Sequence, residues 1–284
     1  MPIRVAINGF GRIGRSAFKA GCNNPDLEFV AVNDLTEPAT LAHLLRYDTA
    51  FGHFDGTVAV DGSDLVVNGK HIKVIAEKEP TKLPWGDLKI DVVLECTGRF
   101  TNADGAQQHI TAGARRVVVS APVKGGNVPT YVFGANSDDY KGEQLINNAS
   151  CTTNCIAPVA QIVHETFGIQ KALMTTIHAV TAEQNLVDGP PPGGKSNDLR
   201  RARAAYMNMV PTSTGAAIAT TEAIPELKGL FDGLSIRVPI IDVSLSDFTF
   251  LLARKTSKEE LNDVFTMASE QPRWKGIVVL QMNS

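Results

Sequence analysis

The stretch IRVAINGFGRIGR, residues 3–15, decides the fold of the first half of this chain. Ile3 to Asn8 is an apolar run of strand length, and a glycine-rich turn from Gly9 to Gly14 follows it directly. The residues after the turn are typical of a helix that fades between Gly21 and Pro25. A strand, a Gly-x-Gly-x-x-Gly turn and a helix in this order predict the first βα unit of a parallel sheet.

The same alternation of strand and helix patterns continues to about residue 150. Leu27–Val32 is predicted as the second strand, and an intervening helix is expected over 103–114. Further strands are expected at 72–76, 91–95, 116–120, 131–134 and 145–146. This order predicts a Rossmann-type parallel sheet with helices on both faces, in a domain spanning residues 1–150.

After Ser150 the pattern changes. A long helix is expected over 151–167, an alternating strand over 171–181, a helix near 214–224 and two strands within 235–254. The segment DGPPPGGKSN, residues 188–197, has too many prolines and glycines for a helix or a central strand. Ser257 and Glu260 have capping-box spacing for a helix that runs to about residue 268. We therefore expect a second, α+β domain over 151–284, with a mixed or antiparallel sheet.

Composition excludes several classes of protein. The chain has 284 residues, 43% of them hydrophobic and 20% charged, which is typical of an ordered globular protein of two domains. With 27 Lys+Arg against 30 Asp+Glu and no long block of one sign, a nucleic-acid or membrane-surface binder is not indicated. No apolar run has membrane-spanning length and no leader precedes the first strand, so we expect a cytoplasmic protein. The 4 cysteines lack metal-site or disulfide spacing, so we expect reduced thiols and no metal.

The glycine-rich turn gains meaning from Asp34, which ends the second strand pattern twenty residues after Gly14. A helix N-terminus behind glycines suits a pyrophosphate, and a strand-end carboxylate accepts hydrogen bonds from a ribose diol. The negative charge of Asp34 would repel a 2′-phosphate, so NAD is favoured over NADP. The alternative interpretation is a tight turn between ordinary βα elements, with an exposed aspartate at the end of a strand.

Two residues of the second half are candidates for nucleophilic chemistry. Cys151 is expected at a helix N-terminus, where the thiolate is favoured, and His178 ends the alternating strand. From the pattern alone, Cys151 could equally be a small buried hydrophobe, and His178 could serve a structural hydrogen bond. Cys155, one helical turn further on, is expected to pack in the core.

From Ile3 to about Gly276 the chain resembles the phosphorylating glyceraldehyde-3-phosphate dehydrogenases. The matching motifs are INGFGRIGR (7–15), ECTGRF (95–100), SAP (120–122), NNASCTTNC (147–155), TTIHAVT (175–181), DLRRARAA (198–205), PTSTGAA (211–217) and RVP (237–239). The resemblance implies NAD-dependent oxidative phosphorylation of glyceraldehyde 3-phosphate to 1,3-bisphosphoglycerate in glycolysis. It also implies that Cys151 is the nucleophile, which forms a thiohemiacetal and then a thioester, and that His178 activates it.

The resemblance further assigns the binding residues and the partners. The residues that contact NAD would be Gly9, Phe10, Gly11, Arg12, Ile13, Gly14, Asp34, Lys78 and Ser120, with Lys78 replacing an arginine common in the family. The residues of the two anion subsites, for the substrate phosphate and for inorganic phosphate, would be Ser150, Thr152, Thr181, Arg201, Thr214, Gly215 and Arg237. We expect Arg200 and Arg203 to form solvated or subunit-interface ion pairs instead. By the same resemblance we expect a homotetramer.

The sequence departs from the family in two places. The loop 189–197 is longer and richer in proline and glycine than the segment that lines a neighbouring subunit's cofactor site in the family. The chain stops at Ser284, where the family continues with further strands, a nicotinamide-binding asparagine and a terminal helix, and we expect this to affect stability, assembly and activity. Two alternatives remain: an erythrose-4-phosphate dehydrogenase, against which Thr181 and Thr214–Gly215 argue, and a truncated, inactive paralogue that retains nucleotide or partner binding.

Overall fold

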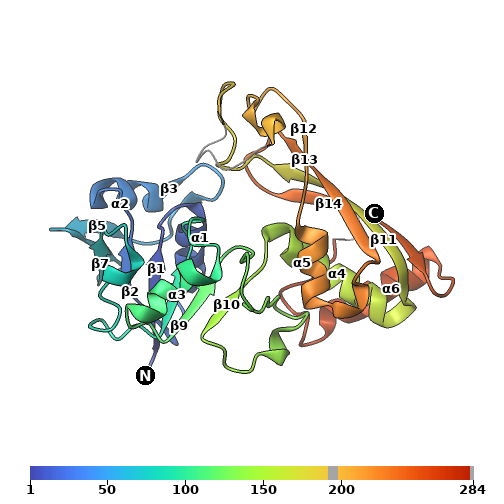
Figure 1. Cartoon of the computed structure of the whole chain (residues 1–284), viewed down its shortest axis with the longest axis horizontal. Coiled ribbons are helices and arrows are strands. Elements are labelled where there is room, and N and C mark those ends of the chain that lie inside the picture. The colour runs from blue at the N-terminus through green and yellow to red at the C-terminus, as the bar shows by residue number, and fades with distance from the viewer. Residues whose placement is uncertain (191–197, 282–284) are drawn as a thin grey trace. The chain divides into compact units, whose positions relative to one another are not determined.

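The computed structural model describes residues 1–190 and 198–281, and the chain divides into two compact units (Figure 1). The first unit comprises Met1–Thr130 and Tyr140–Asn148. The second comprises Tyr131–Asp139 and Ala149–Ser284. A short segment from the middle of the chain, residues 131–139, therefore belongs to the second unit.

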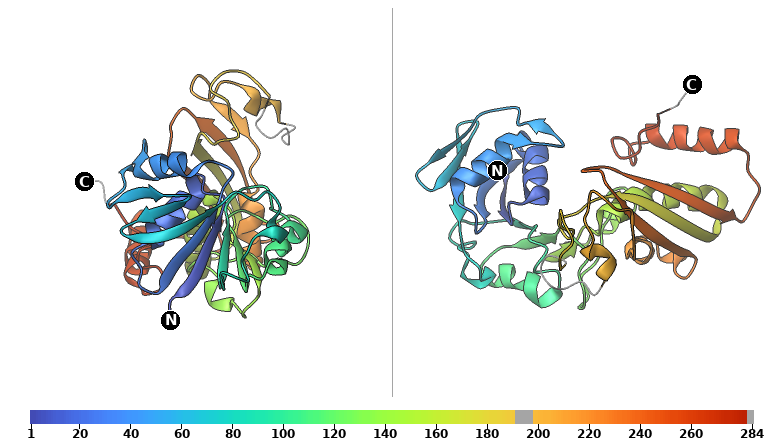
Figure 2. Two further views of the ribbon diagram at one scale, coloured as in Figure 1. Left: turned by 90° about the vertical axis from the view of Figure 1, so that its left-hand side faces the viewer. Right: turned by 90° about the horizontal axis from the view of Figure 1, so that it is seen from above.

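The first unit is built on an eight-stranded sheet in the order β10-β9-β8-β1-β2-β7-β6-β5. Six consecutive strands of this sheet run parallel to one another: β1 (Ile3–Asn8), β2 (Leu27–Asn33), β7 (Lys70–Ile75), β8 (Val92–Glu95), β9 (Arg116–Val119) and β10 (Leu145–Asn147). The left view of Figure 2 shows these strands fanning out side by side. The prediction of a parallel, Rossmann-type sheet is confirmed.

Helices cover both faces of this sheet because successive residues of its central strands are apolar and point alternately to the two faces. Ile7 of β1 packs in one core with α1 (Arg12–Gly21) and α2 (Pro38–Arg46). Ala6, the preceding residue, points to the other core, which contains α3 (Ala103–Thr111). The central strands of the sheet are thus covered on both sides, and the ends of parallel strands are where a ligand is expected.

Several elements of the first unit were not predicted from the sequence. Besides α2, they are the short pair β3 (Tyr47–Asp48) and β4 (Gly52–His53), and the antiparallel extension β5 (Val58–Asp61) and β6 (Asp64–Val67). Short 3₁₀ turns complete the connections in both units: η1 (Pro80–Lys82), η2 (Ser137–Asp139), η3 (Leu199–Ala202) and η4 (Pro225–Leu227).

The second unit has a four-stranded mixed sheet in the order β12-β13-β11-β14. Its strands are β11 (Ile169–Ala179), β12 (Val210–Thr212), β13 (Phe231–Val238) and β14 (Ser244–Leu252), and β11 is parallel to β13 but antiparallel to β14. The helices α4 (Cys151–Phe167), α5 (Ala216–Ala223) and α6 (Lys258–Glu270) share one core with one face of the sheet. The α+β prediction is therefore confirmed.

The predicted strand at 131–134 is wrong. Gly134 has a φ of +81°, and the backbone turns there, with N–H groups of Ala135 and Asn136 both donating to the Val132 carbonyl at 3.1 Å. The capping box is confirmed, since the Ser257 hydroxyl accepts the Glu260 N–H at 3.1 Å. Of the predicted loop 188–197, residues 191–197 lie outside the described residues. Among the described residues, no helix combines the length and the apolar character needed to cross a membrane.

Candidate functional site

The glycine-rich turn lies at the carboxyl edge of the parallel sheet, between β1 and α1. Gly9 has a φ of +90°, and a Cβ on it would lie 2.8 Å from the Thr97 backbone nitrogen. A Cβ on Gly14 would lie 2.2 Å from the Gly9 carbonyl oxygen, so both positions require glycine. By contrast, a Cβ on Gly11 would meet nothing within 4 Å, so the space beside this residue is open.

The open turn fits a dinucleotide phosphate. No side chain caps the N-terminus of α1, so the N–H groups of its first turn remain available to an anion. Asp34, directly after β2, accepts the N–H of Phe10 at 2.8 Å and that of Thr36 at 3.0 Å. These contacts fix the Asp34 carboxylate beside the turn, where a ribose diol is expected.

The other predicted cofactor residues follow neighbouring strands of the same sheet. Lys78 is exposed after β7, Ser120 is half-buried after β9, and Ile13 is exposed on the first turn of α1. Carboxyl ends of parallel strands share one edge, so these residues border the edge that carries the turn. The Arg12 guanidinium is engaged by Asp48 at 3.4 Å. Its backbone N–H belongs to the first turn of α1, which no side chain caps.

In the second unit, Cys151 begins α4 because two residues before it set the helix start. Ala149 is buried with a φ of +54°, a left-handed conformation that is strained for alanine. The Ser150 hydroxyl then accepts the Thr153 N–H at 3.1 Å as the N-cap. Cys151 is consequently the first helical residue, and its side chain is exposed.

His178, from the end of β11, reaches this thiol. Its Nε2 lies 3.3 Å from the Cys151 Sγ, and its Nδ1 lies 2.7 Å from the Ala179 carbonyl oxygen. That carbonyl can only accept, so Nδ1 carries a proton and Nε2 faces the sulfur. The hydrogen bond to His178 lowers the pKa of the Cys151 thiol, and the same bond raises the pKa of His178. Both shifts favour a thiolate–imidazolium pair.

The expectation that Cys155 packs in the core is wrong, because this side chain is exposed. Residues four apart on a helix lie on the same face, and Cys151 itself is exposed. The buried stripe of α4 is carried instead by residues such as Ile156, Ala160 and Val163.

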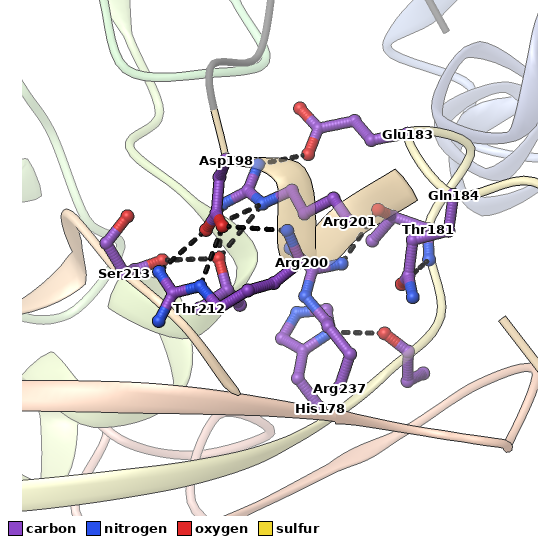
Figure 3. Close-up of polar contacts among 11 residues, drawn as sticks. His178, Thr181, Glu183, Gln184, Asp198, Arg200, Arg201, Thr212, Ser213 and Arg237 are labelled. Atoms are coloured by element: carbon purple, nitrogen blue, oxygen red, sulfur yellow. Dashed lines mark hydrogen bonds and ion pairs between the residues drawn. The ribbon is translucent and has the colours of Figure 1, made fainter. Parts of the chain in front are cut away.

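Two arginines from distant segments gather above His178 (Figure 3). The strand register pairs His178 with Arg237 of β13, and Arg237 donates to the Thr181 hydroxyl at 2.7 Å. Burial, with a further contribution from the positive charge of Arg201, lowers the pKa of Arg237. The Arg237 Nε is also buried without a hydrogen-bond partner. An anion between the two guanidinium groups would relieve both penalties.

Arg201 is held by groups that the sequence interpretation missed. Its Nε and one terminal nitrogen donate to the Thr212 hydroxyl at 2.9 and 2.7 Å, and the other donates to Glu183 at 2.6 Å. Thr212 belongs to the PTSTGAA motif, which was the only available signal for it, whereas nothing in the sequence pointed to Glu183. Arg200 forms an ion pair with Asp198, and Arg203 forms one with Asp188, as we expected from the sequence.

The remaining predicted subsite residues lie at two helix starts. Thr152 is buried in the first turn of α4 and hydrogen-bonds Cys151, which further lowers the thiol pKa. Thr214 accepts the Ala216 N–H at 3.1 Å. Gly215 is the N-cap residue of α5 and has no side chain to cap the helix. α5 and α4 pack in the same core. The hydroxyl of Ser150 is already engaged as the cap of α4.

Comparison with known proteins matches both halves of the chain. Residues 3–103 match the family described as "Glyceraldehyde 3-phosphate dehydrogenase, NAD binding domain", and residues 150–284 match "Glyceraldehyde 3-phosphate dehydrogenase, C-terminal domain". The chain is 49% identical over 272 residues to the glyceraldehyde-3-phosphate dehydrogenase of Geobacillus stearothermophilus, covering 95% of this chain and 79% of that protein. It is 52% identical over 287 residues to the enzyme of the same name from Mycolicibacterium smegmatis, covering 98% and 82%.

Proposed function

Because this chain belongs to the glyceraldehyde-3-phosphate dehydrogenase family, we propose that Cys151 is the nucleophile and His178 the base of its NAD-dependent reaction. One observation carries the assignment: the Sγ of Cys151 lies 3.3 Å from the Nε2 of His178, at the N-terminus of α4. The pKa of the thiol is lowered and that of the imidazole is raised, which suits proton transfer from sulfur to nitrogen near neutral pH.

The covalent steps follow from this pair. His178 Nε2 takes the thiol proton, and the Cys151 thiolate attacks the aldehyde carbon of glyceraldehyde 3-phosphate. The proton on Nε2 then passes to the former carbonyl oxygen, which gives a thiohemiacetal, and Nε2 takes it back as that carbon is oxidised to a thioester. When bound, NAD supplies the two-electron oxidant for this step. Inorganic phosphate attacks the thioester carbon, and the acyl phosphate leaves as the sulfur of Cys151 is released.

We assign the phosphate groups of the reaction to the residues around Arg237. Arg201, Arg237 and the Thr181 hydroxyl form one cationic cluster, in which a phosphate would complete the coordination of the half-buried Arg237 guanidinium. The hydroxyls of Thr152 and Thr214, with the Gly215 N–H, would form the second subsite. The Ser150 hydroxyl accepts the Thr153 N–H as the cap of α4, and we propose that its own O–H donates to the anion.

NAD is the cofactor, and we propose that the residues of the carboxyl edge of the first sheet hold it. Gly9, Phe10, Gly11, Arg12, Ile13 and Gly14 would receive the pyrophosphate on the backbone of the turn, and Asp34 the adenosine ribose. Lys78 and Ser120 would complete the site. On this basis we propose that residues 1–150 form the NAD-binding domain and 151–284 the catalytic domain. The compact units differ from these bounds in that residues 131–139 and 149–150 group with the catalytic half.

The function is tested by NADH formation from glyceraldehyde 3-phosphate, with and without inorganic phosphate. We expect turnover that requires phosphate, complete loss of it in Cys151→Ser with NAD binding retained, and near-parental turnover in Cys155→Ser. Cys155→Ser is the matched control, because both thiols are exposed on α4. A Cys151→Ser variant that still oxidises the aldehyde would rule out the covalent route, and phosphate-independent turnover would favour a hydrolytic relative.

We also propose that the chain forms a homo-oligomer, a tetramer by family resemblance. The second sheet presents a face with exposed Leu173, Leu234, Leu245 and Leu251 on three neighbouring strands, opposite the helices. An apolar face of this kind suits a second copy of itself across a two-fold axis. Light scattering should give a multiple of the chain mass, which Leu245→Lys should reduce. A cytoplasmic location is proposed because the thiolate of Cys151 needs reducing conditions, and cell fractionation would test it.

A further inference from the structure

The ECTGRF motif contributes no residue to either site assigned above, yet its glutamate is the centre of a buried polar network. Glu95 ends β8 and is 1% exposed. One carboxylate oxygen accepts the N–H of Thr97 at 2.8 Å and also the Thr97 hydroxyl. The other lies 2.5 Å from the Asn8 Nδ2 and 3.0 Å from the His109 Nε2. Four donors therefore converge on one buried carboxylate.

The proton position on His109 follows from its second contact. The Trp85 Nε1 lies 3.0 Å from the His109 Nδ1, and an indole nitrogen can only donate. Nδ1 is therefore the acceptor, the proton is on Nε2, and His109 donates it to Glu95. Trp85, His109 and Glu95 form a directed chain of donors, in which the carboxylate is the terminal acceptor.

On its other side, the network crosses the sheet to the segment after β7. The Asn8 Oδ1 accepts from the Asn33 Nδ2 at 2.6 Å. Asn33 also donates to the Glu77 carbonyl and accepts the Glu77 N–H, both at 2.9 Å. One continuous set of hydrogen bonds thus joins the carboxyl ends of β8, β1 and β2 to the chain beyond β7.

Each point of this network adjoins a residue that we assign to NAD. Asn8 precedes Gly9, Asn33 precedes Asp34, and Glu77 precedes Lys78. Thr97, held by Glu95, supplies the backbone against which Gly9 packs so closely that a Cβ would lie 2.8 Å from its nitrogen. Asn8, Asn33, Glu95, His109 and Trp85 are all 5% exposed or less, so none has the surface to touch a ligand.

We propose that Glu95 and Asn33 are positioning residues for NAD, which set the spacing of the glycine turn, Asp34 and Lys78 through the backbone. The proposal rests on the NAD-dependent function given above. A buried polar network adds little net stability compared with well-packed apolar residues, but it specifies one geometry because each donor has one acceptor. The geometry specified here is that of the cofactor edge.

The test is Glu95→Gln, which keeps the shape and replaces one acceptor oxygen by an NH₂ donor. On one side this NH₂ would face the Thr97 N–H. On the other it would face the amide of Asn8 and the Nε2–H of His109, which Asn33 and Trp85 hold in place. A donor set against a buried donor forces the Thr97 backbone or the Asn8 side chain to move. We expect the Kd and the KM for NAD to rise about tenfold or more, while kcat at saturating NAD and the alkylation rate of Cys151 change less than about threefold.

The matched control is Trp85→Phe, which removes one donor at the end of the network remote from Gly9 and Asn33. It should lower the midpoint of thermal unfolding, as Glu95→Gln does, but leave the Kd for NAD within about twofold. If Glu95→Gln does not fold, Asn33→Ala replaces it, since it frees Glu77 and should raise the same Kd about tenfold.

The proposal is overturned if Glu95→Gln binds NAD with the Kd of the parent. It is also overturned if Trp85→Phe raises the Kd for NAD as much as Glu95→Gln does, because the effect would then be general destabilisation. A parent chain that binds no NAD would overturn the cofactor site and this proposal together. Parent binding with an unaffected Glu95→Gln would overturn only the proposal.

Discussion

Replacing His178 with asparagine should raise the pKa of the Cys151 thiol, because the imidazolium is its only partner among the described residues that combines a positive charge with a hydrogen bond to sulfur. At 3.3 Å, opposite unit charges attract by about 5 kcal/mol at an effective dielectric constant of 20 and by about 1 kcal/mol in bulk water. Cys151 is exposed, so solvent screening keeps the attraction near the lower figure. We therefore expect the thiol pKa to rise in His178→Asn, because an attraction of about 1 kcal/mol to the thiolate is lost.

The sign of the pH dependence follows directly. In the parent the thiol pKa is lowered, so we expect thiolate, and with it fast alkylation, at pH values below the ordinary thiol pKa of about 8.5. In His178→Asn the rate profile should move to higher pH, and turnover should fall by about 10² to 10⁴, the range for a lost general base.

The assay is the rate of iodoacetamide labelling against pH, followed by mass, in a Cys155→Ser background. That substitution removes the other exposed thiol, and burial raises the pKa of Cys22 and that of Cys96, the latter to about 11, so labelling reports Cys151. His71→Asn, an exposed histidine of the first unit, is the control for losing a histidine elsewhere. An unchanged profile in His178→Asn would refute the pairing and leave the N-terminus of α4 as the sole activator of the thiol.

Three further substitutions test the cofactor edge, the anion cluster and the fold. Asp34→Ala should reduce the ratio of kcat/KM for NAD to kcat/KM for NADP about tenfold. A parent chain that uses both cofactors equally would contradict the role that we assign to the Asp34 carboxylate. Arg237→Lys should raise the KM for glyceraldehyde 3-phosphate about tenfold through loss of the guanidinium fork, with the KM for NAD unchanged, whereas a parental substrate KM would remove Arg237 from the anion site. Ser257→Ala removes the cap of α6, so it should lower the free energy of unfolding by about 1 kcal/mol and the midpoint of thermal unfolding by about 2 to 4 °C, at unchanged turnover. An unfolding midpoint equal to that of the parent would show that the cap does not stabilise the fold.

Sequence alone predicted the elements whose ends are set by neighbouring residues. The turn after β1 was predictable because glycine is needed for the +90° φ of Gly9 and the close approach at Gly14. α4 begins at Cys151 and α6 begins at Lys258 because Ser150 and Ser257 cap them. Each serine hydroxyl accepts the N–H three residues further along the chain. Local hydrogen bonds of this kind are encoded within four or five residues, so motif and spacing suffice to find them.

Local pattern failed where a distant residue decided the outcome. The apolar run 131–134 has strand composition, but Gly134 packs on Trp274 of the C-terminal segment, and the chain turns there with a φ of +81° at Gly134. The exposure of Cys155 depends on which face of α4 the sheet and the other helices cover. Both were decided by packing that no window of sequence contains.

The candidate site divides in the same way. The types of residue, a cysteine before a helix, a strand-end histidine and an arginine-rich segment, were visible in the sequence. Their contacts were not, because the 3.3 Å approach of His178 to Cys151 spans 27 residues and requires β11 to run back beside the start of α4. His178 lies beside Arg237, and Glu95 is joined to Asn33 through Asn8, because of the order and register of the strands. Strand order and register are determined by the hydrogen bonds between strands together with the packing of the hydrophobic cores. Only the tertiary structure decides such contacts, because each belongs to two or more segments at once.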